Sequence, residues 1–365
     1  MLKKSFFYFL SITIFFLIVL FSDFILSNTV LKYNHCVEYT EYFYELKKNC
    51  KGKYRFKKSF PLVNTYTDEI GLRVGKNKVK KFKNKENIFL FGDSFTYGVG
   101  IEYEKTFAGL IAKDLKDFNV YNFGVGSYST SVHLFKLQKI IEKNIIPKKI
   151  FVFLDLTDVI DESTRWYYDD NDKKTKLRNN NLYKKSEKLN QNFTDKNFKL
   201  LKNLFSYINY YLRDLKAKIK LKTLNKYKIK TSIQGNFAYT DLNELDARFW
   251  KKNTFENGIN NIKLNFDKII KISEKYNFKV YLVIYPWAET LEYGQDKFSW
   301  SEFGQDLCIN ERCNTIDAIP EFKDYQNNNP SWVTDLYFLN DEHFNTKGAE
   351  LLSTVILKNL NKNND

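Results

Sequence analysis

A serine that could act as a nucleophile stands at Ser94, within the sequence FGDSFTYGVG of residues 91–100. Residues 87–92 form a short apolar run that ends in glycine, which is typical of a buried parallel strand that enters a turn. A serine after such a strand would lie at the carboxyl edge of a parallel sheet, where open α/β folds place their sites. Gly-Asp-Ser is also ordinary turn chemistry, so the motif alone leaves a nucleophile and a structural turn as equal alternatives.

A base and an orienting acid for this serine stand near the other end of the chain. Residues 340–348 read NDEHFNTKG, which places Asp341 two residues before His343. A serine needs a base to remove its proton, and the base needs a carboxylate that holds its tautomer and stabilises the imidazolium. Of the other histidines, His35 precedes the first predicted strand and His133 falls within a predicted helix. We therefore expect His343 to be the base and Asp341 its acid; helix capping or simple exposure is the alternative for the histidine.

The elements that must position these residues alternate between strand and helix, which implies right-handed crossovers and a parallel sheet. Low glycine and proline contents, 14 and 5 residues, also argue against a turn-dense all-β protein. The predicted fold class is therefore α/β. Apolar runs predict strands at residues 87–92, 119–124, 149–156 and 279–285, and helical spacing of apolar residues predicts helices at 106–115, 133–143, 259–276 and 347–360.

Two segments fall outside this alternation. Residues 32–86 are polar, aromatic and rich in lysine, and they predict a stalk that leads into a catalytic domain at 87–365. Residues 159–257 are charged and rich in Asn and Tyr, and they predict a large helical insertion on the sheet. Within it, residues 213–230 carry eight basic side chains against the single Asp214. A solvated face accounts for this charge, and contact with a membrane or an acidic glycan is the alternative.

The N-terminal residues predict a membrane anchor over residues 1–31. Residues 5–22 form 18 uncharged residues after Lys3 and Lys4, near the lower limit of a bilayer-spanning helix and longer than most signal-peptide apolar cores. No small-residue cleavage site follows, so an uncleaved signal anchor is the first interpretation and a cleaved signal peptide the second. The two lysines stay in the cytoplasm under the positive-inside rule. We therefore expect the bulk of the chain to be exported to the periplasm or the extracellular space.

Four cysteines fit an exported protein. They predict two disulfides, most simply Cys36 with Cys50 and Cys308 with Cys313, although four cysteines allow three pairings and four free thiols are the alternative. Neither pair has the C-x2-C spacing of a zinc site, so we expect no metal and no other cofactor.

The net charge of +15 would ordinarily indicate a polyanionic partner. Only seven of the 58 basic residues are Arg, however, and Arg is the residue preferred for phosphate and base recognition. The codon bias of an A/T-rich coding sequence explains the abundant lysine equally well. We therefore expect no nucleic-acid partner.

In these motifs the chain resembles the SGNH/GDSL hydrolase superfamily, over residues 87–360 with the insertion excluded. The resemblance implies a three-layer α/β/α sandwich, with Ser94 as the nucleophile of the Gly-Asp-Ser block. The TDEIGLR sequence of residues 67–73 is similar to the lead-in of membrane-anchored members. The implied activity is that of a serine esterase, which removes acyl groups, with acetyl expected, from a carbohydrate or an envelope polymer.

The resemblance matches the triad better than the oxyanion hole. Besides the nucleophile block at Ser94, the family uses a glycine N–H and an asparagine side chain. The second block aligns Ser127 with that glycine, or Gly126 if the register slips by one, and a backbone N–H serves from either. The third block places Thr157 where the asparagine belongs, and a hydroxyl donates one hydrogen bond over a shorter reach. This predicts a weakened or rebuilt oxyanion hole.

The last block leaves one alternative for the acid. Asn340 stands three residues before the histidine, where many members of the family have Asp, and Asp341 stands two before it. A carboxylate at either spacing can face the imidazole, so the aspartate is the expected acid. The next candidates would be Asp93, Asp155 and Asp158.

Three functions compete at this point. The first is the exported esterase, and the second is an O-acyltransferase that uses the same residues but resolves the acyl-enzyme with a sugar hydroxyl instead of water. The third is a non-catalytic glycan-binding or assembly protein with a decayed site. Thr157 favours the third slightly, and the intact serine, histidine and aspartate oppose it.

Overall fold

The computed structural model describes most of the chain, and all that follows concerns that part. The described residues are 2–29, 36–40, 42–57, 60–77, 81–82, 84–178, 197–198, 200–202, 204–205, 208–209, 211–212, 215–216, 219, 254–296, 298–339 and 341–362.

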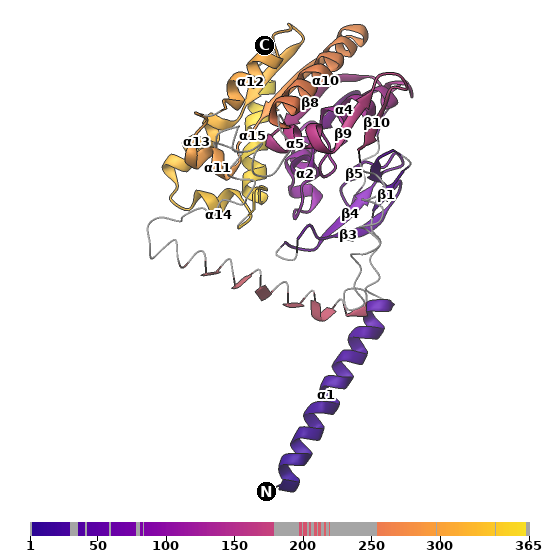
Figure 1. The fold of residues 1–365 in the computed structure, drawn as a ribbon, viewed down its shortest axis with the longest axis vertical. Coiled ribbons are helices and arrows are strands. Elements are labelled where there is room, and N and C mark those ends of the chain that lie inside the picture. Colours follow the sequence, from indigo (N-terminus) through magenta and orange to yellow (C-terminus); the bar gives the residue numbers. More distant parts are fainter. Residues whose placement is uncertain are drawn as a thin grey trace.

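A five-stranded parallel sheet forms the centre of the main domain (Figure 1). The spatial order of its strands is β12-β11-β8-β6-β7. The chain therefore moves to one side after β6 and returns past it to the other, which makes the edge between β6 and β8 the switch point where open sheets bind ligands. The strands are β6 Glu86–Phe91, β7 Phe118–Asn122, β8 Pro147–Leu154, β11 Lys279–Ile284 and β12 Cys313–Asp317.

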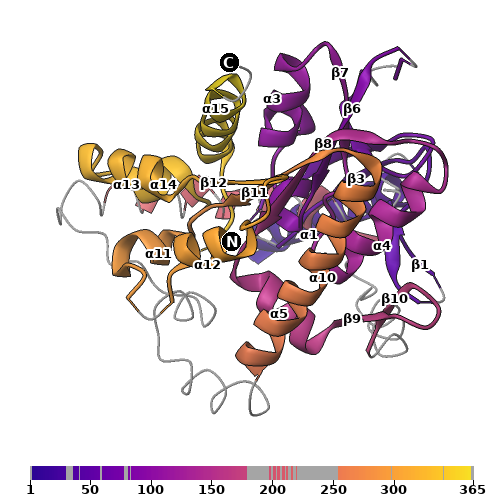
Figure 2. The same ribbon diagram turned by 90° about the horizontal axis from the view of Figure 1, so that it is seen from above.

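Helices cover both faces of this sheet (Figure 2). α3 Phe107–Asp114 packs with α15 Thr346–Lys362 on one face, while α4 Thr130–Ile141 and α5 Leu156–Thr164 pack with α10 Thr254–Tyr276 on the other. The central strands are apolar on both sides and almost fully buried, as two covering layers require. The predicted α/β/α sandwich with a parallel sheet is confirmed.

The fifth strand and four short helices were not predicted. β12 is an edge strand in which only Cys313 and Ile316 are buried, so its sequence lacks the continuous apolar run of the central strands. The helices have at most ten residues, too few for a clear helical period. They are α11 Ala288–Tyr293, α12 Trp300–Leu307, α13 Ile319–Asn328 and α14 Trp332–Leu336.

The segment predicted as a stalk, residues 32–86, instead packs on the main domain in its described part. Phe43, Leu46 and Leu72 are buried in the common hydrophobic core. The strands here are only two to five residues long, so no long periodic stretch marks them in the sequence. They form one antiparallel pair, β1 Val37–Tyr39 with β2 Tyr44–Leu46, and one antiparallel sheet of β3 Lys51–Tyr54, β4 Val63–Thr67 and β5 Arg73–Val74.

Arg73 fixes this segment to the loop that follows Ser94. Its guanidinium is fully buried and donates hydrogen bonds to the carbonyl oxygens of Tyr97, Gly98 (2.8 Å) and Ile101 (2.7 Å). It also lies 4.3 Å from the centre of the Tyr97 ring. The lead-in sequence therefore helps to position the loop of the candidate nucleophile.

The segment predicted as an insertion begins within the main domain. α5 belongs to the helical layer, and a hairpin of β9 Trp166–Asp169 and β10 Lys174–Leu177 follows it. Residues 179–196 and 220–253 lie outside the described residues. The helical character of the insertion therefore stays a prediction over those residues.

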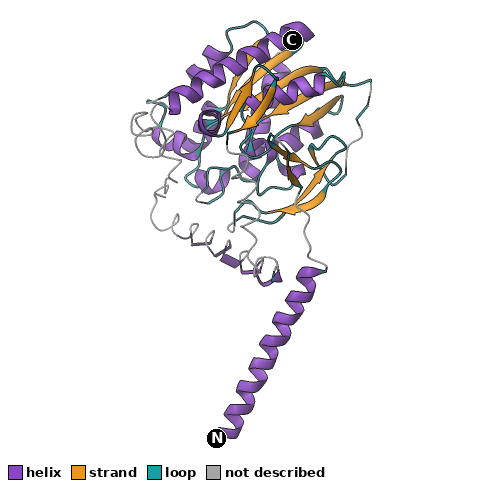
Figure 3. Ribbon diagram, turned by 45° about the vertical axis from the view of Figure 1, so that its right-hand side comes forward, coloured by secondary structure: helices purple, strands orange, loops and turns teal. Residues whose placement is uncertain are grey.

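A long N-terminal helix, α1 Leu2–Asn28, projects from the domain (Figure 3). Its residues 4–28 have a mean hydropathy of 2.5 over the most apolar window, long and apolar enough to cross a membrane. The helix exceeds the predicted apolar stretch of residues 5–22.

Both predicted disulfides, Cys36–Cys50 and Cys308–Cys313, are present. The first joins the strand pair β1–β2 to the sheet of β3–β5. The second closes the turn between α12 and β12.

Candidate active site

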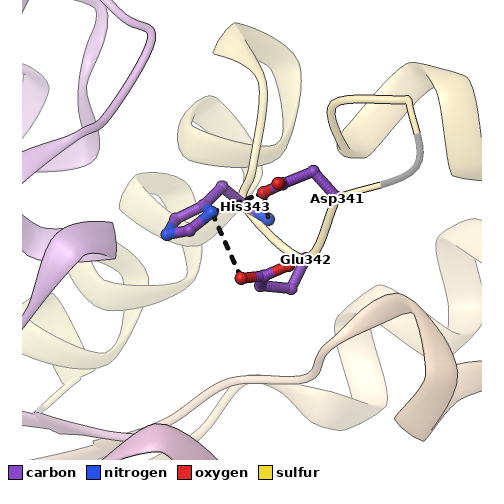
Figure 4. Close-up of side chains that lie close together, drawn as sticks. All are labelled: Asp341, Glu342 and His343. Carbon is purple, nitrogen blue, oxygen red and sulfur yellow. Dashed lines mark hydrogen bonds and ion pairs between the residues drawn. The ribbon is translucent and has the colours of Figure 1, made fainter. Parts of the chain in front are cut away.

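Ser94, His343 and Asp341 lie together at the carboxyl edge of the sheet. Ser94 begins α2 Ser94–Tyr97 just after β6, and the other two lie in the loop before α15. The Nε2 atom of His343 is 2.7 Å from Ser94 Oγ, and its Nδ1 atom is 2.5 Å from Asp341 Oδ1. Asp341 and His343 belong to one loop, and the carboxylate of Asp341 lies beside the imidazole (Figure 4). These contacts have the order that a serine nucleophile, a base and an orienting acid require.

The other candidates for base and acid separate clearly from these residues. His133 is fully buried in α4 against the Phe91 ring, and burial lowers its pKa to about 3, so it is a neutral packed side chain. His35 and Asn340 lie outside the described residues.

The charges around the imidazole favour its protonated form. Burial alone would lower the pKa of His343, but the hydrogen bond and charge of Asp341 outweigh it, and the pKa is raised above the ordinary 6.5. Burial acts to raise the pKa of Asp341, but its contacts with His343 and with the Lys57 ammonium, which pairs with Oδ2, lower it overall. Asp341 is therefore ionised at neutral pH and fixes the tautomer of the ring.

Aromatic side chains enclose the imidazole. Phe95 stacks on it with ring centres 4.7 Å apart, and Phe56 meets it edge-on at 4.9 Å. His343 is 3% exposed and Ser94 9%. Exclusion of water strengthens the electrostatic contacts of the pair. Sequence reasoning missed Phe56 and Lys57, because both come from the segment predicted as a stalk and carry no motif.

The raised pKa of His343 predicts how kcat/KM depends on pH. The imidazole must be neutral to act as the base, so activity on a small ester should rise with pH through an ionisation above 6.5. Lys57→Met removes a positive charge beside Asp341, should raise the pKa of His343 further, and should move the rise to higher pH. The control is Lys51→Met, an exposed lysine of β3.

The pH profile can fail in two ways. A rise centred at or below 6.5, or a shift to lower pH in Lys57→Met, would contradict this account of the site. Asp93 and Glu342 also act on the imidazole, but Lys57 pairs directly with Asp341, so its substitution tests that carboxylate first.

The backbone N–H groups that the sequence predicts as oxyanion donors lie in Ser94 itself and in a loop next to it. Among the described residues, none accepts a hydrogen bond from the backbone N–H of Ser94, Gly126 or Ser127. A Cβ atom at Gly126 would lie 3.9 Å from the Cβ of Ser94, so this loop adjoins the nucleophile. The Tyr44 hydroxyl donates a hydrogen bond to the Gly126 carbonyl oxygen (2.6 Å). Because the peptide is planar and trans, the N–H of Ser127 points in the opposite direction to that carbonyl and is held there by the same hydrogen bond.

Thr157 differs from the prediction. Its hydroxyl contacts the carboxylates of Asp155 (Oδ1, 2.5 Å) and Asp93 (Oδ2, 3.1 Å). A hydroxyl has one proton to donate, and carboxylate oxygens are strong acceptors for it. The structure therefore directs this proton away from the oxyanion role that the sequence predicts.

Buried carboxylates lie behind the nucleophile. Ser94 Oγ is 3.1 Å from Asp93 Oδ2, and Asp155 Oδ2 accepts from the Trp287 indole at 3.1 Å. Burial, reinforced by the charge of Asp155, raises the pKa of Asp93 to about 7, and burial raises that of Asp158 as well. Asp93 therefore titrates near neutral pH, and its carboxyl group is a second hydrogen-bond partner of the Ser94 hydroxyl besides His343.

One described group of side chains has the composition of a metal site. The donor atoms of Asp341, Glu342 and His343 lie within 4.8 Å of one another. The histidine and Asp341 already bond to each other, and the Lys57 ammonium pairs with Asp341 and lies 4.0 Å from Glu342. A resident cation opposes the binding of a second cation, so the group is better suited to proton transfer.

Comparisons with known proteins found structural likeness at low sequence identity. No family model and no curated protein matches the sequence. A lipolytic G-D-S-L family protein from Veillonella parvula is 12% identical over 75% of this chain and 97% of its own, with a TM-score of 0.40. A psychrotrophic esterase from Pseudoalteromonas sp. is 12% identical over 76% and 98%, with a TM-score of 0.38.

An acetyl-xylooligosaccharide esterase from Geobacillus is 9% identical over 77% of this chain and 95% of its own, with a TM-score of 0.40. Scores of this size do not by themselves assign a fold or an activity. The fold assignment rests on the strand order, and the activity rests on the geometry of the site.

Proposed function

We propose that the chain is an SGNH/GDSL-type serine hydrolase, an exported esterase that removes acyl groups, with acetyl expected, from a carbohydrate or an envelope polymer. The observation that carries the proposal is the line of contacts from Ser94 Oγ through His343 to Asp341. Its place at the switch point of the parallel sheet supports the same reading.

The proposed reaction uses each of these groups in turn. His343 Nε2 takes the hydroxyl proton as Ser94 Oγ attacks the ester carbonyl carbon, and Asp341 stabilises the imidazolium. The N–H groups of Ser94 and of Gly126 or Ser127 donate to the oxyanion of the tetrahedral intermediate. The intermediate collapses to an acyl-enzyme as the alcohol leaves with the proton from Nε2. Water, deprotonated by the same nitrogen, then attacks the acyl carbon, and the bond to Ser94 Oγ breaks as Nε2 returns the proton to Oγ and the acid is released.

A cavity that borders the loop of Gly126 and Ser127, though its walls do not include Ser94 or His343, supports a saccharide as the alcohol part of the substrate. It has a volume of about 320 Å³, far more than an acetyl group needs, and its walls include Tyr54, Tyr97 and Phe56 with Lys53 at one side. It reaches Gly126 and Ser127, the candidate oxyanion donors. The flat aromatic rings of this cavity and its few polar groups suit a ligand that has both apolar faces and hydroxyl groups.

Acyl transfer is the second candidate, and the cavity bordered by Gly126 and Ser127 favours it, because it has room for a sugar near an acyl group on Ser94. A sugar hydroxyl bound in the cavity would then compete with water as the acceptor.

The activity is tested with full-length protein in detergent and O-acetylated oligosaccharides. We expect release of free acetate, and acetylated product in addition when an unacetylated oligosaccharide is supplied as an acceptor. His343→Ala is the inactive reference. If the wild-type protein forms neither product above the level of this variant, the proposed function is wrong.

If the protein is exported and anchored in the membrane, it should be found in the membrane fraction, and its cysteines should be paired in disulfides. We expect the protein to stay with membranes after an alkaline wash, because α1 is long and apolar enough to span them. Thiol labelling of the denatured, unreduced protein should find no free cysteine, because both disulfides form in an oxidising compartment. After reduction all four cysteines should label. Soluble protein with four reactive thiols would overturn export.

A further inference from the structure

A stripe of exposed apolar side chains lies in a region that the active site does not use. Each of these residues is helical and between 43% and 62% exposed, which is unusual for so many large apolar side chains on one soluble surface. The apolar stripe consists of Leu200, Leu204, Phe205, Ile208, Tyr211, Leu212, Leu215 and Ile219.

The spacing places the apolar stripe on one helical face. Its members recur at intervals of three and four residues, which bring side chains to the same side of a helix. The described helical residues Lys202, Asn209 and Lys216 are seven positions apart and lie on the side opposite to Leu204 and Tyr211, with Phe205 and Leu212 at the margin between the two sides. A helix that is apolar on one face and basic or polar on the other is the form that lies in a membrane interface.

Contacts with α1 fix where the apolar stripe begins. The carboxylate of Asp23, which is 1% exposed, accepts hydrogen bonds from the backbone N–H groups of Leu200 (2.9 Å) and Leu201 (3.0 Å). Asn28 Nδ2 donates to Asn197 Oδ1 at 3.1 Å. Asp23 closes the uncharged stretch of α1, so these contacts lie where a spanning helix would leave the hydrocarbon. The described pieces run in a row across that end of α1 (Figure 1).

We infer that the apolar stripe binds the surface of the lipid bilayer beside the anchor, with its apolar side chains in the boundary between headgroups and acyl chains. The charge of the region agrees, because residues 196–220 hold seven Lys and Arg against one Asp, and lysines suit anionic headgroups. The inference rests on the proposed anchor, since α1 brings the stripe to the membrane. It places the catalytic domain against the bilayer, which favours substrates held at the envelope surface.

The test measures lipid contact one residue at a time in the full-length protein. Single cysteines replace Leu204 and Tyr211 on the stripe, and Asn209 and Lys216 off it, and each carries an environment-sensitive dye. The protein is reconstituted in vesicles of phosphatidylglycerol and phosphatidylethanolamine with spin-labelled lipids as quenchers. The native cysteines are paired and do not react. We expect quenching by shallow spin labels several-fold stronger at the two stripe positions than at the two controls.

A fifth variant, Phe16→Cys in α1, separates the two proposals. Quenching of Phe16→Cys by deep spin labels, without stronger quenching on the stripe than at Asn209→Cys and Lys216→Cys, overturns the inference and leaves the anchor intact. Stripe quenching without quenching at Phe16→Cys overturns the spanning anchor and leaves the surface contact standing. The absence of both overturns both.

Discussion

Ser94→Ala should lower kcat on an aryl acetate by a factor on the order of 10⁶, the size of the loss when the nucleophile of a serine protease is removed. The reason is that His343 Nε2 would have no hydroxyl to activate and no acyl-enzyme could form. Among the described residues the hydroxyl hydrogen-bonds to His343 and Asp93, and the Cβ atom is kept, so the melting temperature should stay within a few degrees of wild type. Initial rates and thermal denaturation measure the two effects.

The matched control is Ser299→Ala, another serine with a structural role. Its hydroxyl accepts from the Glu302 N–H at the start of α12, so its loss should cost about 1 kcal/mol of stability and no activity. A Ser94→Ala protein that keeps more than a small fraction of the wild-type rate would remove this serine from the mechanism.

Asp341→Asn should lower turnover by about 10⁴-fold, as the corresponding change does in serine proteases. An amide keeps the shape of the carboxylate, but it cannot stabilise the imidazolium and can hold the ring in the wrong tautomer. The loss should appear mainly in kcat, because the carboxylate acts through His343 and the substrate cavity does not include it. Turnover on one ester at neutral pH measures it, with His343→Ala as the inactive reference.

Glu342→Gln is the matched control for this carboxylate. It removes the same charge one residue away, and its Oε1 lies 3.8 Å from His343 Nδ1, beyond a hydrogen bond. We expect Glu342→Gln to lose far less turnover than Asp341→Asn, and we expect the same of Asn340→Ala. If Glu342→Gln or Asn340→Ala proves more damaging than Asp341→Asn, the orienting acid is not Asp341.

Four of the five strands of the central sheet were predictable because their signal is local. Each buried strand is a continuous apolar run, and each crossover helix carries its own period, so residues 87–92 and 149–156 could be read without any distant contact. The three candidate catalytic residues were predictable for a related reason. Each stands in a short motif next to an element boundary, and the topology brings those boundaries to one edge.

The surroundings of the site were not predictable, because they depend on contacts between distant segments. Lys57 reaches Asp341 across more than two hundred residues, and Phe56 packs on His343 from the same segment. The strands of that segment, β1 to β5, are short and polar, so the sequence does not predict this packing. The direction of the Thr157 hydroxyl follows from the carboxylate of Asp155 in its own motif and from that of Asp93, which caps the helix after a different strand.

The central claim is that an acyl-enzyme forms on Ser94, and mass spectrometry of the acid-quenched protein tests it most directly. Full-length protein is mixed with excess activated acetyl ester, quenched in acid during turnover and digested to peptides. The account predicts one added acetyl group on the peptide that contains Ser94, assigned to that serine by fragmentation, and its absence from Ser94→Ala and His343→Ala. An unmodified Ser94 in protein that turns over the ester, or the same acetylation in His343→Ala, would contradict it.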